Sequence, residues 1–349
     1  MAKMKRKPLD RAVNRRRVLS LFAIGAGAGA SLLGVRSAPA VATTPTVSNV
    51  DIWEGQALGG DASIQLLGFP PKKRAHLLSQ CVSQLRKLER IFSLFDPESD
   101  LVRLNQQGQL HQATPPLLDL LRLSKQLHGQ TDGAFDPTVQ PLWQAAAHHF
   151  QTNSEGAYQP QQATRSKVGF GNVQIDGQDI TLAGGTELTL NGIAQGYITD
   201  QITELLQQAG ARHVLVNLGE FRALGPKPDG QPWQIGVRDP DRIWHLLKRL
   251  PLSAGAIATS AASGQQFDAA GRHHHLFDPA TGQNTQRYKS VSVRAPTATR
   301  ADGLSTAFTV MAQADIVAFI KTDATIGVLL QHKNGRLEKL GNWSASTPS

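Results

Sequence analysis

Residues 188–206 read LTLNGIAQGYITDQITELL, and this stretch decides the fold class. A short strand-like run ends at Leu190, a turn of small residues follows, and apolar residues then recur at helical spacing. Asn191 is predicted to cap the helix, and the glycines allow backbone and ligand to approach closely. Because a helix N-terminus attracts phosphate, the stretch is typical of a phosphate site, although many helices begin this way without a ligand.

Helical and strand-like patterns alternate along the rest of the chain, which predicts an α+β protein with mixed sheets and helices. Helical spacing covers residues 71–92, 116–128, 192–209, 301–311 and 314–322. Strand-like runs cover residues 213–218, 232–238, 256–260, 290–295 and 324–330. The polar segment 151–162 has no periodicity and predicts a surface loop. This loop either separates a smaller lobe around residues 72–150 from the rest of the chain, or the two parts form one fused unit.

The formal charge of the 349-residue chain is concentrated at its N-terminus. The whole sequence carries 36 Lys and Arg against 27 Asp and Glu, a net charge of +9. Residues 1–42 contain nine of the basic side chains and a single acid, Asp10, so 27 basic and 26 acidic residues remain. Since this remainder is nearly neutral and aromatic residues make up only 6% of the chain, no nucleic-acid partner is expected.

The first 42 residues have the three parts of an export signal. A basic stretch ends at Arg17, a weakly apolar run covers residues 18–35, and the small-residue segment SAPAVA follows. The junction NRRRVLS at residues 14–20 resembles the twin-arginine motif. We therefore expect residues 1–42 to be a twin-arginine export signal read by the twin-arginine export machinery, and residues 43–349 to be a periplasmic domain. The alternative is an uncleaved membrane anchor, because 18 apolar residues are close to the minimum for spanning a bilayer.

The single cysteine, Cys81, excludes a disulfide within the chain. It shares the apolar side of the predicted helix 71–92 with leucines, which predicts a buried core thiol.

A carboxylate and a hydroxyl are spaced for one helix face at the start of the predicted helix 301–311. Asp302 and Thr306 are four residues apart, so both side chains can direct oxygen atoms at one point near the helix N-terminus. Carboxylate, hydroxyl and carbonyl oxygens are the ligands that Mg²⁺ prefers. The simpler interpretation is that Asp302 only interacts favourably with the helix dipole.

Two further motifs have alternative interpretations. Residues 131–138, TDGAFDPT, form either an ordinary capped turn or a loop that clamps a ligand. Residues 272–279, RHHHLFDP, contain three consecutive histidines. Neighbours in a strand point to opposite faces, so at most two of these histidines can converge, and a zinc or copper site is not favoured.

In their order along the chain these motifs resemble the ApbE family, flavin transferases that use FAD as the donor of FMN. The resemblance covers nearly the whole predicted periplasmic domain. The matching stretches are GQALGGDASI (55–64), FSLFDPESDLVRLN (92–105), DGAFDPTVQPL (132–142), KVGFGNVQI (167–175), LTLNGIAQGYITDQITELL (188–206), HVLVNLGEFRALG (213–225), AIATSAASGQQF (256–267), HHHLFDPATGQ (273–283) and SVSVRAPTATRADGLSTAFTV (290–310).

The resemblance implies a fold with an FAD site between two lobes, and a Mg²⁺-dependent transfer of FMN to a threonine of a periplasmic or membrane redox protein, with release of AMP. The acceptor would carry a threonine flavinylation motif. The implied metal ligands are the carbonyls of Gly192 and Ser305, the Asp302 carboxylate and the Thr306 hydroxyl. The implied FAD contacts are Leu58, Phe95, Ala134, Phe135, Asp136, Thr189, Gln195 and Leu276. Asp302 is the implied catalytic residue together with His275, which either contacts flavin and assists proton transfer or is a structural imidazole.

The chain departs from the family pattern at several positions of the site. Thr189 and Gln195 stand where the family usually has Asp and Lys, which fits the loss of one ion pair as a unit. Glu220 stands in for a usual Asp in a segment that is one residue shorter, and Ala261 replaces a usual Gly.

Three functions are therefore compatible with the sequence. They are an FMN transferase, an FAD pyrophosphate hydrolase that releases FMN and AMP, and a flavin-binding or flavin-delivering protein of a respiratory system with little catalysis. The intact set of Asp302, Ser305 and Thr306 favours the two enzymes, and the changes at Thr189 and Gln195 favour the third function.

Overall fold

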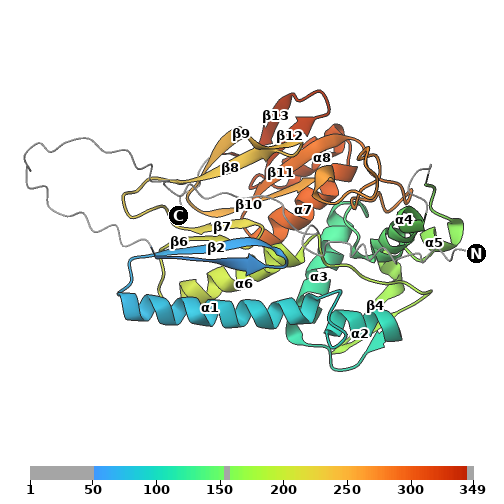
Figure 1. Cartoon of the computed structure of the whole chain (residues 1–349), viewed down its shortest axis with the longest axis horizontal. Coiled ribbons are helices and arrows are strands. Elements are labelled where there is room, and N and C mark those ends of the chain that lie inside the picture. The colour runs from blue at the N-terminus through green and yellow to red at the C-terminus, as the bar shows by residue number, and fades with distance from the viewer. Residues whose placement is uncertain (1–50, 153–157, 344–349) are drawn as a thin grey trace, which may run out of the picture.

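The computed structural model describes residues 51–152 and 158–343, and its centre is an antiparallel sheet of eight strands (Figure 1). Every neighbouring pair in this sheet is antiparallel. The strands lie in the order β1 (Asp51–Ala57), β2 (Gly60–Leu67), β6 (His213–Asn217), β7 (Phe221–Leu224), β10 (Gly255–Ala261), β11 (Tyr288–Ala295), β12 (Gly327–His332) and β13 (Leu337–Gly341).

Both faces of the sheet are covered by apolar side chains. Helices α1 (Pro71–Phe92), α6 (Ala194–Gln208) and α7 (Ala298–Val310) contribute to the larger core, with α1 and α6 beneath the sheet in Figure 1. The opposite face packs against a hairpin, β8 (Trp233–Asp239) and β9 (Arg242–Leu252). Strand β10 shows the alternation, because Ala256 and Ala258 belong to the helical core and Ile257 to the hairpin core.

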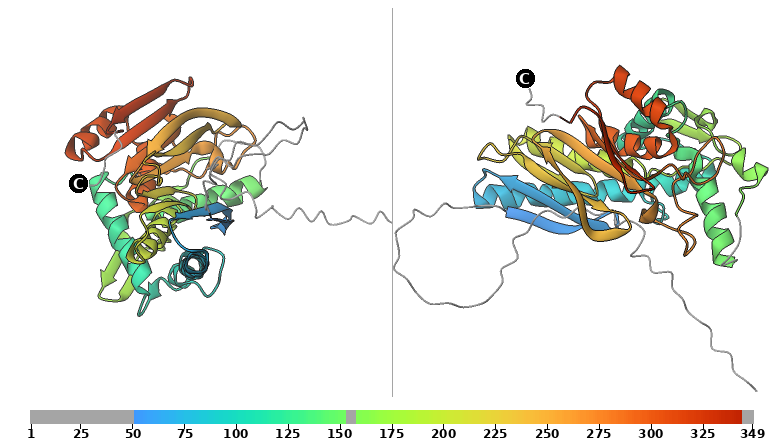
Figure 2. Two further views of the ribbon diagram at one scale, coloured as in Figure 1. Left: turned by 90° about the vertical axis from the view of Figure 1, so that its left-hand side faces the viewer. Right: turned by 90° about the horizontal axis from the view of Figure 1, so that it is seen from above.

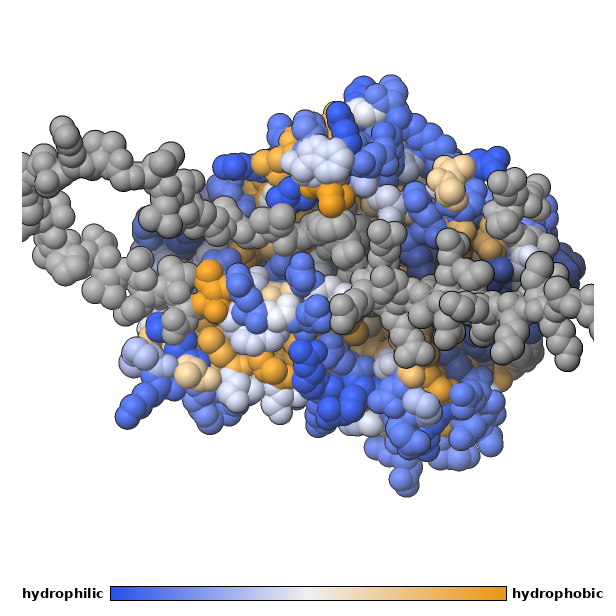
Figure 3. Space-filling model, in the orientation of Figure 1, coloured by the Kyte–Doolittle hydropathy of each residue, from blue (hydrophilic) through white to orange (hydrophobic). Residues whose placement is uncertain are grey.

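The remaining elements join the same helical core or flank it. They are α2 (Asp100–Gln107), α3 (Pro115–Gln130), α4 (Gln140–Thr152), α5 (Gln162–Arg165), α8 (Gln313–Thr322) and a small sheet of β3 (Gln109–Leu110), β5 (Asp179–Leu182) and β4 (Val173–Asp176). Buried residues of α1 and α3 belong to one cluster with those of the large sheet. The end-on view in Figure 2 (left) shows α1 along its axis below the sheet. On the face drawn in Figure 3, hydrophilic residues predominate and apolar ones form scattered patches.

The predicted α+β class and all ten predicted elements are present, and all elements but α1 have shifted ends. Helices α1, α3, α6, α7 and α8 and strands β6, β8, β10, β11 and β12 occupy the expected ranges. The predicted buried thiol is confirmed, because Cys81 is inaccessible to solvent and burial raises its pKa to about 12. Among the described residues no helix is both long enough and apolar enough to span a membrane. The predicted export signal, residues 1–42, lies outside the described residues.

Four details of the sequence prediction were wrong. The strand-like run that ends at Leu190 is not a strand, because residues 186–190 pair with no strand of the described structure. Asn191 does not cap α6, because the Leu190 carbonyl accepts from the N–H groups of Ile193 and Ala194 and the helix begins only at Ala194. Helix α7 begins three residues earlier than predicted, because the Thr297 side chain accepts from the Arg300 N–H. The loop expected at 151–162 is shorter, because α4 ends at Thr152 and α5 begins at Gln162.

Helices α6 and α7 approach each other closely at Gly196. A Cβ atom at this position would lie 2.3 Å from the carbonyl oxygen of Ala298 and 2.8 Å from Cβ of Asp302. The Gly196 N–H donates to Oδ2 of Asp302 at 2.9 Å, so the absence of a side chain is what allows this hydrogen bond. A glycine is therefore required here for packing and not for a left-handed backbone.

We expect Gly196→Ala to lower the free energy of unfolding by about 1–3 kcal/mol, because a methyl group would force the two helices apart. The matched control is Gly129→Ala in α3, where a Cβ atom would have no heavy atom within 4 Å. This control should be neutral or stabilising by up to about 1 kcal/mol, because alanine is the better helix former. Urea unfolding measures both values, and equal effects of the two substitutions would contradict the packing argument.

Candidate functional site

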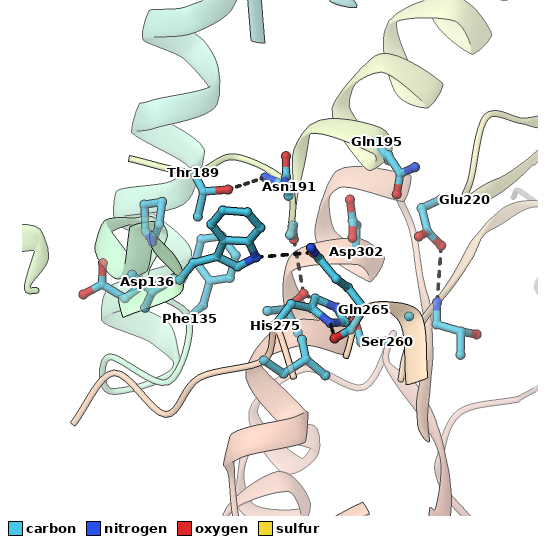
Figure 4. Close-up of a pocket in the computed structure, with 18 residues that line it drawn as sticks. Phe135, Asp136, Thr189, Asn191, Gln195, Glu220, Ser260, Gln265, His275 and Asp302 are labelled. Atoms are coloured by element: carbon cyan, nitrogen blue, oxygen red, sulfur yellow. Dashed lines mark hydrogen bonds between the residues drawn. The ribbon is translucent and has the colours of Figure 1, made fainter. Parts of the chain in front are cut away.

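A cavity of about 950 Å³, partly open to solvent, lies at one end of the sheet where five parts of the chain meet (Figure 4). Its walls come from the loop after α3 and the start of α4, the turn before α6, the β6–β7 turn, the end of β10 with the segment after it, and α7. The lining residues include Phe135, Asp136, Trp143, Thr189, Asn191, Gly192, Gln195, Glu220, Thr259, Ser260, Gln265, His275, Leu276, Asp302 and Thr306. Apolar walls with a few convergent polar groups are typical of small-molecule sites.

Asp302 is a buried carboxylate of the cavity. It is almost fully buried in α7, with one oxygen atom fixed by the Gly196 N–H. Burial raises the pKa of Asp302 from its ordinary value of 3.8 to about 7, the nearby Asp200 carboxylate raises it too, and the Gly196 N–H opposes the shift. A carboxylate in this environment gains stability from a cation.

A second buried carboxylate, Glu220, lies on the β6–β7 turn, where it is close to Asp302 of α7. Its Oε2 atom accepts from the Thr259 N–H at 3.3 Å. Burial raises the pKa of Glu220 well above its ordinary value, and the charge of Asp302 raises it further. The turn depends on Gly219, with φ of +107°, where a Cβ atom would lie 2.6 Å from Nε2 of Gln195. Two acidic groups therefore share one cavity with the neutral amide of Gln195.

The oxygen atoms around Asp302 fit a hard divalent cation. The Thr306 hydroxyl lies 3.4 Å from the Gly192 carbonyl oxygen and 3.3 Å from Oγ of Ser260. Among the described residues no group of three His, Cys, Asp or Glu side chains could hold a metal, so a site here would use one carboxylate with hydroxyl and carbonyl oxygens. This all-oxygen donor set fits Mg²⁺ and not zinc or copper.

Ser305 supports this group from behind. Its side chain is buried and bonds to Oγ of Ser260 at 2.7 Å and to the Asp302 carbonyl at 2.9 Å. Its own carbonyl lies in the interior of α7, where a carbonyl accepts the helical hydrogen bond and keeps a second lone pair.

His275 presents an imidazole to the cavity in one tautomer. Its Nδ1 atom lies 3.2 Å from the carbonyl oxygen of Gln265, and since a carbonyl can only accept, Nδ1 carries the proton. Burial lowers the pKa of His275, so the ring is neutral and its Nε2 atom can accept a proton. The neighbouring His274 is different, because its Nε2 atom bonds to the Thr285 carbonyl and burial lowers its pKa to about 4.

The loop at 131–138 forms the opposite wall. Asp136 accepts from the N–H and hydroxyl of Thr138 at 2.8 and 2.6 Å, which caps a short 3₁₀ turn, Pro137–Val139. Burial raises the pKa of Asp136, and Thr138 and the nearby His128 oppose the shift. The loop is thus a capped turn whose Phe135 and Asp136 also line the cavity.

Most of the residues predicted from the sequence line this cavity, and four do not. Leu58 lies in the turn between β1 and β2, where its N–H donates to Glu89 at 2.6 Å. Phe95 lies in the loop after α1 and is 75% exposed. Ala134 lines a neighbouring cavity that shares Asp136 with this one, and Ser305 lies behind the wall.

Sequence reasoning missed a contact that closes one side of the cavity. The indole N–H of Trp143 in α4 donates to Oε1 of Gln265 at 3.3 Å, across 122 positions of the chain. No local pattern marks such a pair. Ser260 belongs to the stretch 256–267, in which nothing singles it out, and its bonds to α7 appear only in three dimensions.

The chain is similar to known proteins along most of its length. A sequence model of the ApbE family matches residues 58–330. A FAD:protein FMN transferase of Klebsiella pneumoniae (strain 342) is 27% identical over 286 residues, which cover 77% of this chain and 81% of that protein.

Solved structures show the same α+β fold. The crystal structure of the ApbE protein of Thermotoga maritima MSB8 has a TM-score of 0.72 at 27% identity and covers 83% of this chain and 97% of that chain. The flavin transferase ApbE from Vibrio cholerae has a TM-score of 0.69 at 25% identity and covers 83% of this chain and 97% of that chain.

The raised pKa of Asp302 gives a test for a cation at this position. Between pH 3.8 and about 7 the unfolded chain loses a proton that the folded protein keeps, so stability falls as the pH rises through this window. We expect Asp302→Asn to keep the hydrogen bond from Gly196 and to raise the free energy of unfolding at pH 8 in EDTA by about 1–3 kcal/mol. Mg²⁺ should raise the melting temperature of the wild-type protein at pH 8, and equal stabilisation of the variant would show that the cation binds elsewhere.

Proposed function

The chain belongs to the ApbE family, and from this premise we propose that it is a FAD:protein FMN transferase. The reaction uses Mg²⁺, attaches FMN through a phosphoester to a threonine of a redox protein, and releases AMP. The observation that carries the proposal is the convergence of the Asp302 carboxylate, the Thr306 hydroxyl and the Gly192 carbonyl in one cavity with the neutral imidazole of His275. A protein that only holds flavin does not need such a cation site.

The chemistry is a phosphoryl transfer, which depends mainly on positioning and charge. The threonine oxygen attacks the phosphorus of the FMN half, the phosphoanhydride bond breaks, and AMP leaves with the bridging oxygen. The proton of the hydroxyl passes to Nε2 of His275, which Nδ1 and the Gln265 carbonyl hold in the accepting tautomer. When bound at Asp302, Mg²⁺ would neutralise the charge that develops on the pyrophosphate.

The flavin half of FAD lies against the wall formed by Phe135, Asp136 and Leu276, which carries aromatic and apolar side chains. Thr189 and Gln195 face the same cavity and offer neutral hydrogen-bonding groups to the pyrophosphate. The export signal at residues 1–42 supports a periplasmic location reached through the twin-arginine machinery. The acceptor is then a periplasmic or membrane redox protein that carries a threonine flavinylation motif.

The proposal is tested with purified protein, FAD, Mg²⁺ and a synthetic peptide that contains the segment Asp-x-x-x-Ala-Ala-Thr. We expect the peptide to gain the mass of FMN less water, and AMP to appear in equal amount. Asp302→Ala should reduce the rate by at least about 100-fold, because the cavity loses its carboxylate, and His275→Asn should reduce it by about 100-fold or more. Mass spectrometry measures the peptide and chromatography measures AMP.

The controls distinguish the three functions that the sequence leaves open. A peptide with alanine in place of threonine should stay unmodified, and EDTA should stop the reaction. AMP release with unmodified threonine peptide would identify a hydrolase. Tightly bound, intact FAD with neither product would overturn both enzymatic functions.

The neutral Gln195 gives a second prediction about this site. Its amide lies over the Gly219–Glu220 turn, so Gln195→Lys would place an ammonium group among Asp302, Glu220 and the pyrophosphate. We expect this substitution to tighten FAD binding by about 10- to 100-fold, because a charge-assisted hydrogen bond replaces a neutral one. Fluorescence titration of FAD measures the dissociation constant.

The matched control for this prediction is Gln195→Met, which keeps the length of the side chain but removes its hydrogen-bonding amide. This variant should weaken FAD binding. Thr189→Asp, alone and combined with Gln195→Lys, completes a double-mutant cycle. A coupling energy near zero in that cycle would show that the two positions are not the halves of one lost ion pair.

A further inference from the structure

A second cleft of about 790 Å³ lies between the main sheet and the β8–β9 hairpin. Its apolar walls are Phe221 and Ile257 from the sheet and Ile235, Val237 and Ile243 from the hairpin. Ser263 lines it as well, in the short turn after β10. The cleft is thus bounded by two separate layers, the sheet and the hairpin.

The cleft shares a wall with the cavity of the candidate site. Glu220, Thr259 and Gly264 line both spaces. Glu220 is also the carboxylate whose pKa the charge of Asp302 raises, so this shared wall lies next to Asp302. The neighbouring cavity that Ala134 lines also shares a residue with the cavity of the candidate site. That residue is Asp136, on the wall opposite Glu220.

The two ends of the central cavity differ in chemistry. In Figure 4 Phe135 and Asp136 lie on one side of Asp302 and Glu220 lies on the other. The flavin half of the donor takes the aromatic side under the proposed function. In-line transfer requires the attacking hydroxyl to approach the phosphorus opposite the leaving group, so the acceptor needs its own path to Asp302.

The charges of the hairpin wall favour an acceptor segment that is neutral or acidic. Arg238 lines the cleft and its guanidinium donates to the Ile243 carbonyl at 2.7 Å. Asp239, the acid of the hairpin wall, is already paired with Arg242 at 2.9 Å. The hairpin wall therefore presents one guanidinium without a carboxylate partner among the described residues.

We propose that this cleft, between the β8–β9 hairpin and the sheet, binds the acceptor polypeptide and delivers its hydroxyl past Glu220 to the cavity. The inference rests on the proposed function for the identity of the occupant. It assigns to Ile243, Ser263 and Arg238 a role in acceptor binding that is separate from binding of FAD.

A cysteine experiment tests the location without requiring transfer. The chain has one cysteine, Cys81, which is buried, so an introduced thiol reacts alone. The Ser263→Cys variant is incubated with the threonine peptide carrying a thiopyridyl-activated cysteine, in EDTA, and each rate is divided by the rate with small dithiodipyridine. Thiol exchange then forms a peptide–protein disulfide and releases pyridinethione.

We expect the normalised rate of the Ser263→Cys variant to exceed that of the control Trp244→Cys by at least about 10-fold, because binding raises the local peptide concentration. Trp244 lies on the same hairpin, is 77% exposed and does not line the cleft. Equal normalised rates for the two variants would overturn the proposal. Protection of the thiol in Ser263→Cys by FAD alone would overturn it too, because the cleft would then belong to the dinucleotide.

A kinetic experiment separates this inference from the proposed function. Ser263→Trp narrows the cleft and should lower kcat/KM for the peptide by about 10-fold or more while leaving the dissociation constant of FAD unchanged. Unchanged kcat/KM would refute the cleft while the transferase function stands. If the wild-type protein transfers nothing, the proposed function fails, and the cysteine rates still decide whether the cleft binds the peptide.

Discussion

The contact between α6 and α7 is the constraint on which the site depends. Asp200 in α6 accepts from the N–H groups of Ala298 and Thr299, both at 2.8 Å, and also from Arg222 of β7. One carboxylate thus binds the start of α7 to α6 and to the sheet. One turn further along α7, the Gly196 N–H bonds to Asp302, so the same pair of helices fixes the carboxylate of the cavity. Any movement between these helices would displace the buried acid.

Burial of this acid has a cost that shapes the surrounding residues. Asp302 and Glu220 face one cavity, and the charge of Asp302 makes Glu220 harder to ionise. Buried charges persist in proteins when they are paired or bind metals. Thr306, Gly192 and Gln195 contribute a hydroxyl, a carbonyl and an amide group to the same cavity. A divalent cation is therefore the simplest partner for the buried Asp302 carboxylate.

The sequence predicted the parts of the fold that local pattern controls. The 22-residue helix α1 has the expected bounds, because its apolar spacing and its N-terminal proline are local signals. In the large sheet and the hairpin, strands β1, β2, β7, β9 and β13 were missed. Only β1 and β13 are edge strands of the large sheet, whereas β2 and β7 lie inside it. Helix α7 is buried nearly all round, so its sequence lacks the alternation of apolar and polar residues that marks a helix start. The start is fixed by Thr297 and by Asp200, and Asp200 lies 98 positions away from Ala298. The pair Trp143 and Gln265 was equally beyond local reasoning.

The candidate site was predictable to the extent that its residues lie in contiguous motifs. Asp302 and Thr306 share one helix face, as their spacing required, although they lie one turn inside α7. Glu220, in contrast, acquires its importance only because the β6–β7 turn carries it to α7. The near-neutral net charge of residues 43–349 also bears on this site. Under the proposed function, a cation held at Asp302 would supply positive charge to the pyrophosphate that the net charge of residues 43–349 does not.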